Sequence, residues 1–265
     1  MNPAQDSPWL SIVTVVKDDS EGLQATAASI AAQDQVDIEW VVIDSSADSD
    51  AVSSLVAQSG IANARAVWVD PEGIYPAMNV GLADARGTYI YFANAGDTLR
   101  GGKALTNVGR AVLDHEPAWL FAPVEIIQRD GTVVVTPHWD YAKEKAHLFS
   151  RGLFPPHQGT VVKTEVLRSI GGFDTQYTIA ADYAAFLRLS QVADALQISY
   201  VLATFREGGA STQNWQQSFA EFHRARLAIL QPTGTDRLRE QASTWWHHGK
   251  VFAYREVINR RGRTA

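Results

Sequence analysis

The beginning of this sequence alternates between strand-like and helix-like segments, and this alternation most constrains the fold. Runs rich in β-branched residues lie at Ser11–Val16, Ile38–Ile43 and Ala66–Val69, and the segment Glu21–Gln33 has apolar residues near helical spacing. These patterns predict buried strands, the first two joined by a helix. Because parallel strands need such a crossover, we expect an α/β domain with a mostly parallel sheet. Ligands of these sheets bind beyond the carboxyl ends of the strands.

Polar residues follow three of the predicted strands. Lys17–Ser20 and Asp44–Asp48 come directly after the first two strands, and Asn94–Asp97 follows a later one at Thr88–Ala93. Each acid by itself has the alternative role of capping a helix or starting a turn. Together they predict carboxylates gathered at one edge of the sheet.

Two common phosphate-binding motifs are absent. The segment Lys17–Leu23 contains a single glycine rather than the G-x-G-x-x-G of dinucleotide folds, and Gly96–Lys103 has Gly102 where a P-loop carries its lysine. Phosphate charge would therefore be balanced by a divalent ion. Carboxylates at strand ends are suitable hard oxygen ligands for Mg²⁺ or Mn²⁺.

The rest of the chain is interpreted as one continuous α/β unit followed by helices. The Asp-Gly turn at 129–131 predicts a hairpin, and Pro232 predicts a break between the last helices. No linker separates two domains. The predicted elements are strands at Trp119–Ile127, Thr132–Thr136, Thr160–Val162 and Ile198–Phe205, and helices at Lys103–Leu113, Thr164–Ile170, Ala180–Val192 and from Trp215 onward.

Composition excludes several classes of protein. The chain is 46% hydrophobic with a formal net charge of −6, which argues against disorder and against capture of nucleic acid over the whole surface. The absence of cysteine excludes disulfides, zinc thiolate sites and thiol catalysis. The first ten residues lack a secretory pattern, and no window approaches the roughly 18 apolar residues of a spanning helix. These features predict a cytoplasmic protein.

An ordered set of short motifs runs along about 200 residues of the chain. The most specific is Gly73–Gly81, and the others are Ser11–Asp18, Val42–Asp44, Ala85–Ile90, Phe92–Asp97, Pro156–Gly159, Gly171–Asp174, Ala181–Tyr183 and Gly208–Ser211. This set resembles the family 2 glycosyltransferases, which have the GT-A fold, and within them the bacterial subgroup of colanic acid and similar polysaccharide enzymes. The resemblance implies one nucleotide-sugar-binding domain, a mixed and mostly parallel sheet flanked by helices, over residues 1–212, with a helical extension at 213–265 packed on it.

The resemblance implies transfer of a hexosyl or deoxyhexosyl group from a nucleoside diphosphate sugar to an acceptor hydroxyl, with inversion at the anomeric carbon. The acceptor would be a glycan or a lipid-linked molecule, and the cofactor a divalent cation, Mg²⁺ or Mn²⁺. Asp97 occupies the place of the metal-binding acid, whereas Asn94 replaces the first acid of the D-x-D motif. Asp182 occupies the place of the general base in this family, so the resemblance implies that role for it. Its alternative role is that of an acid at a helix N-terminus.

The remaining candidate residues divide into two groups by the part of the substrate that they would contact. The nucleotide group is Thr14, Asp18, Asp44, Asn79, Arg86 and Asn94, and the donor-sugar or acceptor group is His157 and Gln158. Three alternatives stay open: Asp44 as a cap, Arg86 in a surface salt bridge and His157 as a structural histidine.

The C-terminal segment from Trp245 to Arg263 combines aromatic and basic residues. A basic amphipathic helix can lie on an anionic membrane, which would place the protein at the inner face of the cell membrane. The alternative is a helix packed on the catalytic domain. Two other functions are kept as alternatives: a sugar-phosphate nucleotidyltransferase, and a catalytically inert nucleotide-sugar-binding module.

Overall fold

The computed structural model describes residues 7–34, 37–208 and 214–242, together with 244, 246 and 249. Its strands are β1 (Leu10–Val16), β2 (Ile38–Asp44), β3 (Ala64–Trp68), β4 (Tyr89–Phe92), β5 (Thr98–Leu99), β6 (Trp119–Phe121), β7 (Val124–Ile127), β8 (Val133–Val135), β9 (Thr160–Lys163), β10 (Leu196–Gln197) and β11 (Ala203–Arg206). Its helices are α1 (Ser20–Ala31), α2 (Ser49–Gln58), α3 (Ile74–Asp84), α4 (Ala104–His115), α5 (Tyr141–Ser150), the short 3₁₀ helix η2 (His157–Gly159), α6 (Thr164–Ser169), α7 (Ala181–Val192) and α9 (Trp215–Leu230).

The main sheet has seven strands in the order β10-β6-β9-β4-β1-β2-β3. The central strand β1 is parallel to β2 and β4, and β3 is parallel to β2. Only β9 runs the other way, between β4 and β6. The prediction of a mixed, mostly parallel sheet is confirmed. A second sheet with the order β5-β11-β7-β8 was not predicted.

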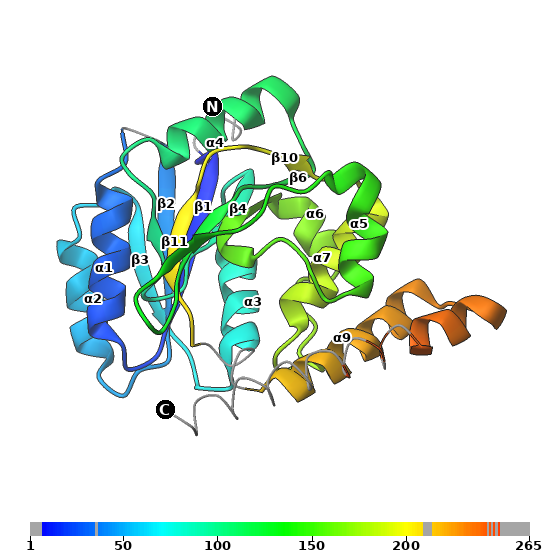
Figure 1. The fold of residues 1–265 in the computed structure, drawn as a ribbon. Helices are drawn as coiled ribbons and strands as arrows, with labels where there is room; N and C mark the ends of the chain where they lie inside the picture. Colours follow the sequence, from blue (N-terminus) through cyan, green and yellow to red (C-terminus); the bar gives the residue numbers. More distant parts are fainter. Residues whose placement is uncertain are drawn as a thin grey trace.

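The apolar core has two layers, one on each face of the main sheet. Successive side chains of a strand point to opposite faces, so neighbouring residues of β1 and β2 belong to different layers. Ile12 of β1 and Trp40 of β2 pack with α1, α2 and α4, whereas Val13 and Val41 pack with α3, α5, α6 and α7. Figure 1 shows α1 and α2 on one side of the sheet and α3 on the other. The carboxyl ends of β1, β2 and β4 therefore lie at one edge, between the two helical layers.

Two predicted strands differ from the structure in their bounds. Trp119–Ile127 is divided between β6 and β7, which belong to different sheets. Pro123 lies at the break and has no N–H to donate to a ladder. Of the predicted strand 198–205, only residues 203–205 lie in a strand, β11, and β10 ends just before the predicted range, at Gln197. Because β10 is parallel to β6 and β11 is parallel to β7, both chain segments pass from the first sheet to the second.

The hairpin around the turn at 129–131 is confirmed by the antiparallel pairing of β7 with β8. Helices α2, α3 and α5 had no counterpart in the sequence prediction. Helix α9 ends at Leu230, and Gln231 adopts a left-handed conformation before Pro232. The predicted break in the last helices is therefore confirmed within the described residues.

Gly87, just before β4, packs closely against the backbone at the start of β1. Its replacement by alanine is expected to destabilise the protein. A Cβ at Gly87 would lie 2.4 Å from the backbone nitrogen of Ser11. Since backbone atoms must then shift, we expect Gly87→Ala to lower the free energy of unfolding by about 2–3 kcal/mol in urea denaturation.

The matched control is Gly109→Ala in α4, where the nearest atom to a new Cβ is 3.6 Å away on Trp9. Alanine is favoured over glycine inside a helix by about 0.5–1 kcal/mol, so this variant should unfold at an equal or higher urea concentration. Equal losses in both variants would contradict the close approach at Gly87.

Candidate functional site

The loops after β1 and β2 are joined to each other at the carboxyl edge of the sheet. Asp18 has a φ of 52°, its N–H donates to Ser46 Oγ at 2.8 Å, and its Oδ1 accepts from Ala47 N–H at 2.9 Å. Asp44 ends β2 and is almost fully buried, with Oδ1 accepting from Ser46 N–H at 2.8 Å. These contacts fix the shape of both loops.

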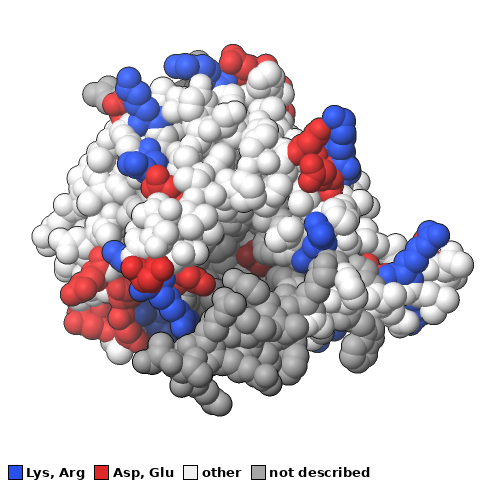
Figure 2. All heavy atoms as spheres, in the orientation of Figure 1, with Lys and Arg blue, Asp and Glu red and all other residues white. Residues whose placement is uncertain are grey.

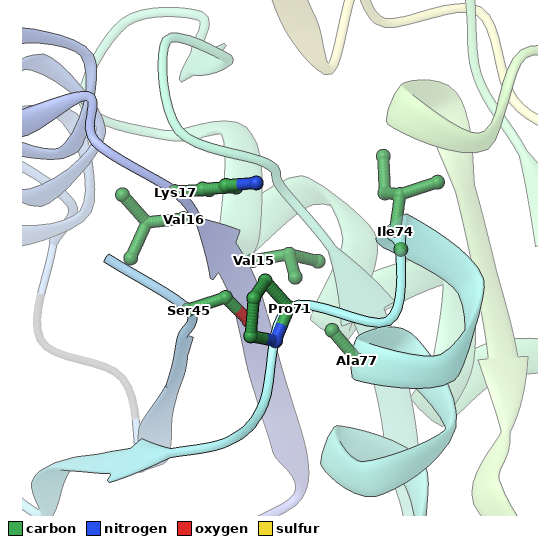
Figure 3. Close-up of a pocket in the computed structure, with 8 residues that line it drawn as sticks. Val15, Val16, Lys17, Ser45, Pro71, Ile74 and Ala77 are labelled. Carbon is green, nitrogen blue, oxygen red and sulfur yellow. The ribbon is translucent and has the colours of Figure 1, made fainter. Parts of the chain in front are cut away.

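A pocket of about 250 Å³ opens between these loops and the start of α3. Its walls are mostly apolar, with one hydroxyl from Ser45 and one cation from Lys17. Figure 3 shows the Lys17 side chain just beyond the end of β1, and Ser45 and Pro71 lower in the same view. The pocket can thus accept a flat ring and place a positive charge beside an attached anion. It is lined by Val15, Val16, Lys17, Ser45, Pro71, Gly73, Ile74 and Ala77.

The turn after β4 presents Asn94 and Asp97. Asp97 Oδ2 accepts from Asn94 N–H at 3.1 Å, and Asp97 N–H donates to Asn94 O at 2.9 Å. From α1, the Thr26 hydroxyl lies 2.8 Å from Asp97 O and accepts from Gly96 N–H at 3.0 Å. Gly96 has a φ of 92°, which favours glycine. The turn is therefore rigid and ties the two side chains to the core.

Asp97 carries a carboxyl group that is costly to ionise. Its side chain lies in a site with only 7% of the residue exposed, and this burial raises its pKa to about 6, although His157, the Asn94 N–H and Gln158 act to lower it. The Asn94 Oδ1 atom beside it is buried without a hydrogen-bond partner among the described residues. A buried carboxylate and an orphan amide oxygen are hard donors, so they fit a divalent cation.

The described residues contain no cluster of three or more His, Cys, Asp or Glu side chains able to enclose a metal. Mg²⁺ typically uses one or two carboxylates and completes its shell with substrate phosphate and water. A cation at Asp97 and Asn94 would therefore depend on oxygens of a bound substrate.

His157, in η2, links Asn94 to Asp182. Its Nε2 lies 3.1 Å from Asn94 Nδ2, and its Nδ1 lies 3.6 Å from Asp182 Oδ2. Because the amide nitrogen can only donate, Nε2 must accept, which places the proton of the neutral ring on Nδ1, toward Asp182. The adjacent Gln158 is fixed through its carbonyl, which accepts from Tyr91 Oη at 2.8 Å.

Asp182 lies in the first turn of α7, with 15% of its side chain exposed. Its Oδ1 accepts from Tyr183 N–H at 2.7 Å and from the Tyr75 hydroxyl at 3.1 Å, while Oδ2 faces His157. Burial, together with the charge of Asp182, raises the pKa of Tyr75 well above its usual range, so the phenol stays protonated. One carboxylate oxygen is thus held and the other faces the site.

The structure brings five of the predicted residues into one cluster: Asn94, Asp97, His157, Gln158 and Asp182. Asp18 and Asp44 lie at the same sheet edge, since Asp44 is paired with Val16 at the end of β1. Figure 2 shows a hollow near the middle of this face with acidic side-chain atoms inside it. Tyr75 was missed as a site residue, although it lies in the segment 73–81 that carried the most specific sequence match.

Three predicted nucleotide residues lie elsewhere. Thr14 is fully buried and its Oγ1 accepts from the Trp40 indole at 2.9 Å. Asn79 exchanges two hydrogen bonds with the backbone of Phe173 and so fixes that turn. Arg86 comes just before β4 and lines a separate pocket with Glu39, near the amino ends of the parallel strands. The structure therefore places Arg86 away from Asn94 and Asp97, rather than in the phosphate pocket where we expected it.

The C-terminal basic segment from Trp245 to Arg263 lies mostly outside the described residues, as do 209–211 of the motif Gly208–Ser211. Within the part of the chain that the structure describes, none of the helices has the length and apolar character needed to cross a bilayer.

Comparison with known sequences finds relatives named as glycosyltransferases, although no family model matches. A Mycobacterium tuberculosis protein named as an uncharacterized glycosyltransferase is 29% identical over 212 residues, which cover 78% of each chain. An O-antigen biosynthesis protein, RfbC of Myxococcus xanthus, is 28% identical over 214 residues, which cover 77% of this chain and 16% of that protein.

Comparison with solved structures identifies the fold. The mannosyltransferase PcManGT of Pyrobaculum calidifontis, in complex with GDP-Man and Mn²⁺, matches 98% of this chain and 81% of its own with a TM-score of 0.64 at 14% identity. TarS 1–349 of S. aureus, in complex with UDP-GlcNAc, matches 83% of this chain and 67% of its own with a TM-score of 0.60 at 15% identity. The chain spans 40% of a longer TarS chain. The fold of this chain is GT-A, as the sequence motifs implied.

Proposed function

We propose that this chain is an inverting glycosyltransferase of family 2, which moves a hexosyl or deoxyhexosyl group from a nucleoside diphosphate sugar to an acceptor hydroxyl. One observation carries the proposal: the buried Asp97 and the partly exposed Asp182 lie on two sides of His157. Displacement at an anomeric carbon needs a group for the leaving diphosphate and a base for the attacking hydroxyl. Asp182 would supply the base, and Asp97 would serve the leaving diphosphate through a divalent cation that it holds together with Asn94.

The pocket at Lys17 and Ser45 is the proposed site for the nucleoside. Its apolar walls suit a base, and the Lys17 ammonium suits a phosphate oxygen. Asp18 and Asp44 shape the loops on its rim. The GT-A complexes with UDP-GlcNAc and GDP-Man support a nucleotide sugar as the donor.

Asp97 and Asn94 would hold a divalent cation, Mg²⁺ or Mn²⁺, through the Asp97 carboxylate and the orphan Asn94 Oδ1. The complex of PcManGT with Mn²⁺ supports this cofactor. When bound, the cation would neutralise charge on the diphosphate. The chain itself contributes the rigid turn at 94–97 and His157, which contacts Asn94. Burial of Asp97 keeps water away from its carboxyl group.

Asp182 is the proposed general base. The acceptor oxygen attacks the anomeric carbon, its proton passes to Asp182 Oδ2, and the bond from the anomeric carbon to the diphosphate oxygen breaks on the opposite face. In-line displacement inverts that carbon. The Tyr75 hydroxyl and Tyr183 N–H hold Oδ1, which leaves Oδ2 available for the proton.

For the acceptor we propose a growing polysaccharide or a glycolipid, which the name of the O-antigen relative supports. The subgroup of colanic acid enzymes, the cytoplasmic location and membrane contact through the C-terminal basic segment remain predictions from the sequence. So does the division into a domain at 1–212 and an extension at 213–265.

Incubation with a panel of UDP-, GDP- and dTDP-sugars plus Mn²⁺ or Mg²⁺ is expected to release nucleoside diphosphate, slowly to water and faster with an acceptor. The matched control is Arg86→Ala, which should keep the wild-type rate because Arg86 lies outside the site. Release of pyrophosphate from sugar phosphate and nucleoside triphosphate would instead identify a nucleotidyltransferase. Donor binding without turnover under any acceptor would identify an inert binding module.

A further inference from the structure

The loop that leads into α7 is held by a helix that lies outside the two sheets. From α9, Arg224 donates to Gln176 O at 2.8 Å and lies over the Tyr177 ring at 4.8 Å. Gln217 donates to the Thr178 hydroxyl at 2.7 Å. Residues 176–178, shortly before Asp182, are therefore fixed to α9.

Glu221 of the same helix also contacts this loop and is only 5% exposed. Its Oε2 accepts from Ile179 N–H at 2.9 Å and from Ala180 N–H at 3.0 Å. Its Oε1 accepts from Thr178 N–H at 3.2 Å, from the Thr178 hydroxyl at 2.9 Å and from Gln217 Nε2 at 3.1 Å. These donors hold the pKa of Glu221 below its usual value in spite of burial.

The position of these bonds explains why a carboxylate is needed. Helix α7 begins after Ala180, whose side chain cannot cap the free N–H groups of a helix start. Glu221, which lies in a distant part of the sequence, accepts from the N–H groups of the two residues immediately before the helix, Ile179 and Ala180. On the other side of the same loop, the Tyr75 hydroxyl lies 2.7 Å from Ile179 O. The segment 178–180 is thus clamped between α3 and α9.

We propose that Glu221 is a positioning residue that sets the place of Asp182 in the reaction, so that α9 completes the catalytic site. This inference rests on the proposed function. Asp182 is two residues beyond Ala180, and its Oδ2 must reach the acceptor proton while Oδ1 stays on Tyr75. A misplacement of about 1 Å can cost about 10²-fold in rate. The contacts of Tyr75 and Glu221 with the segment 178–180 keep Asp182 from shifting by such a distance.

The test compares Glu221→Gln and Glu221→Ala with Gln216→Ala, a substitution at an exposed position of the same helix. A glutamine keeps the size of Glu221 but has one acceptor oxygen, so it leaves one pair of loop donors unmatched. We expect kcat for transfer to fall about 10-fold in Glu221→Gln and about 10²-fold in Glu221→Ala, with the donor KM within about twofold of wild type. Gln216→Ala should match wild type.

Hydrogen exchange provides a second readout that does not use activity. Amides of 178–184 should exchange about 10-fold faster or more in Glu221→Ala, whereas those of β1 and β2 should keep the wild-type rate. The positioning role would be overturned if kcat of Glu221→Ala stayed at the wild-type value. It would also be overturned if kcat and donor KM changed in parallel and exchange rose throughout the protein.

The same measurements separate this inference from the proposed function. A wild-type protein that turns over no donor would refute the proposed function, and the positioning role with it. An active wild type together with a fully active Glu221→Ala would refute the positioning role alone.

Discussion

Asp182→Asn is expected to lower kcat for sugar transfer by about 10²- to 10⁴-fold, the range that a general base contributes. The asparagine Oδ1 can still accept from the Tyr75 hydroxyl and Tyr183 N–H, so the start of α7 should keep its shape. Only the capacity to take the acceptor proton is lost. Steady-state kinetics with a saturating acceptor, together with donor binding by thermal shift, measure the two effects separately.

The control for this variant is Glu165→Gln, at an exposed acid in the first turn of α6. It makes the same chemical change at a helix start away from the site, and wild-type kinetics are expected. Donor affinity in Asp182→Asn should also be unchanged, because the pocket proposed for the nucleoside is lined by residues of β1, of α3 and of the loops after β1 and β2 and before α3. A loss of less than about tenfold in kcat would exclude Asp182 as the base.

Asp97→Asn is expected to lower kcat by about 10²- to 10³-fold and to stabilise the protein without ligand at neutral pH. The asparagine lacks the negative charge that would hold the cation facing the leaving diphosphate, and loss of one preorganised group at a leaving group costs about 10²- to 10³-fold in rate. Burial raises the folded-state pKa of Asp97 from 3.8 to about 6. A raised carboxyl pKa favours the folded state below pH 3.8, and this contribution is lost as the pH rises through 6.

At pH 7.5 the wild-type protein therefore carries a desolvation cost of at most about 3 kcal/mol that asparagine removes. We expect the Tm of Asp97→Asn to exceed that of wild type by up to about 6–10 °C at this pH, with no divalent ion present. The difference should shrink as the pH falls through 6 and vanish near 4. A Tm difference that does not vary with pH would contradict the burial of an ionising Asp97.

Added donor with Mn²⁺ distinguishes the functional role of Asp97 from its effect on stability. Ligand that binds only the folded state raises the Tm of wild type, whereas Asp97→Asn should show a much smaller increase. Arg86→Ala is again the control, since Arg86 lies away from the site and should leave the increase intact. Equal increases in wild type and Asp97→Asn would remove Asp97 from the donor site.

The first half of the sheet could be predicted from sequence because its signals are local. The strand at Ser11–Val16 corresponds to β1 within one residue, and the helix predicted at Glu21–Gln33 corresponds to α1. The strand predicted at 119–127 was too long because periodicity does not reveal that an extended segment changes sheets. Pro123 was the only local sign of that change. The strand predicted at 198–205 began too early, since only residues 203–205 of it lie in β11.

The place of the candidate residues was predictable where they end or follow a strand. Asp44 is the last residue of β2, Asp18, Asn94 and Asp97 follow β1 and β4, and all four lie at the carboxyl edge of the sheet. Arg86 lies away from these residues because a residue just before a parallel strand lies at the opposite edge of the sheet. Thr14 lies within β1, where its hydroxyl accepts from the Trp40 indole of the neighbouring strand.

By itself the sequence determined that polar loops gather at one edge of a parallel sheet, because strand period and the residues after each strand are encoded within a few positions. Only the tertiary structure decided how these loops meet the rest of the chain. His157 joins Asn94 across 63 residues, and Tyr75 meets Asp182 across 107. Ala180 meets Glu221 across 41 residues. Contacts over such separations depend on how helices pack on the sheet, and no local pattern records that packing.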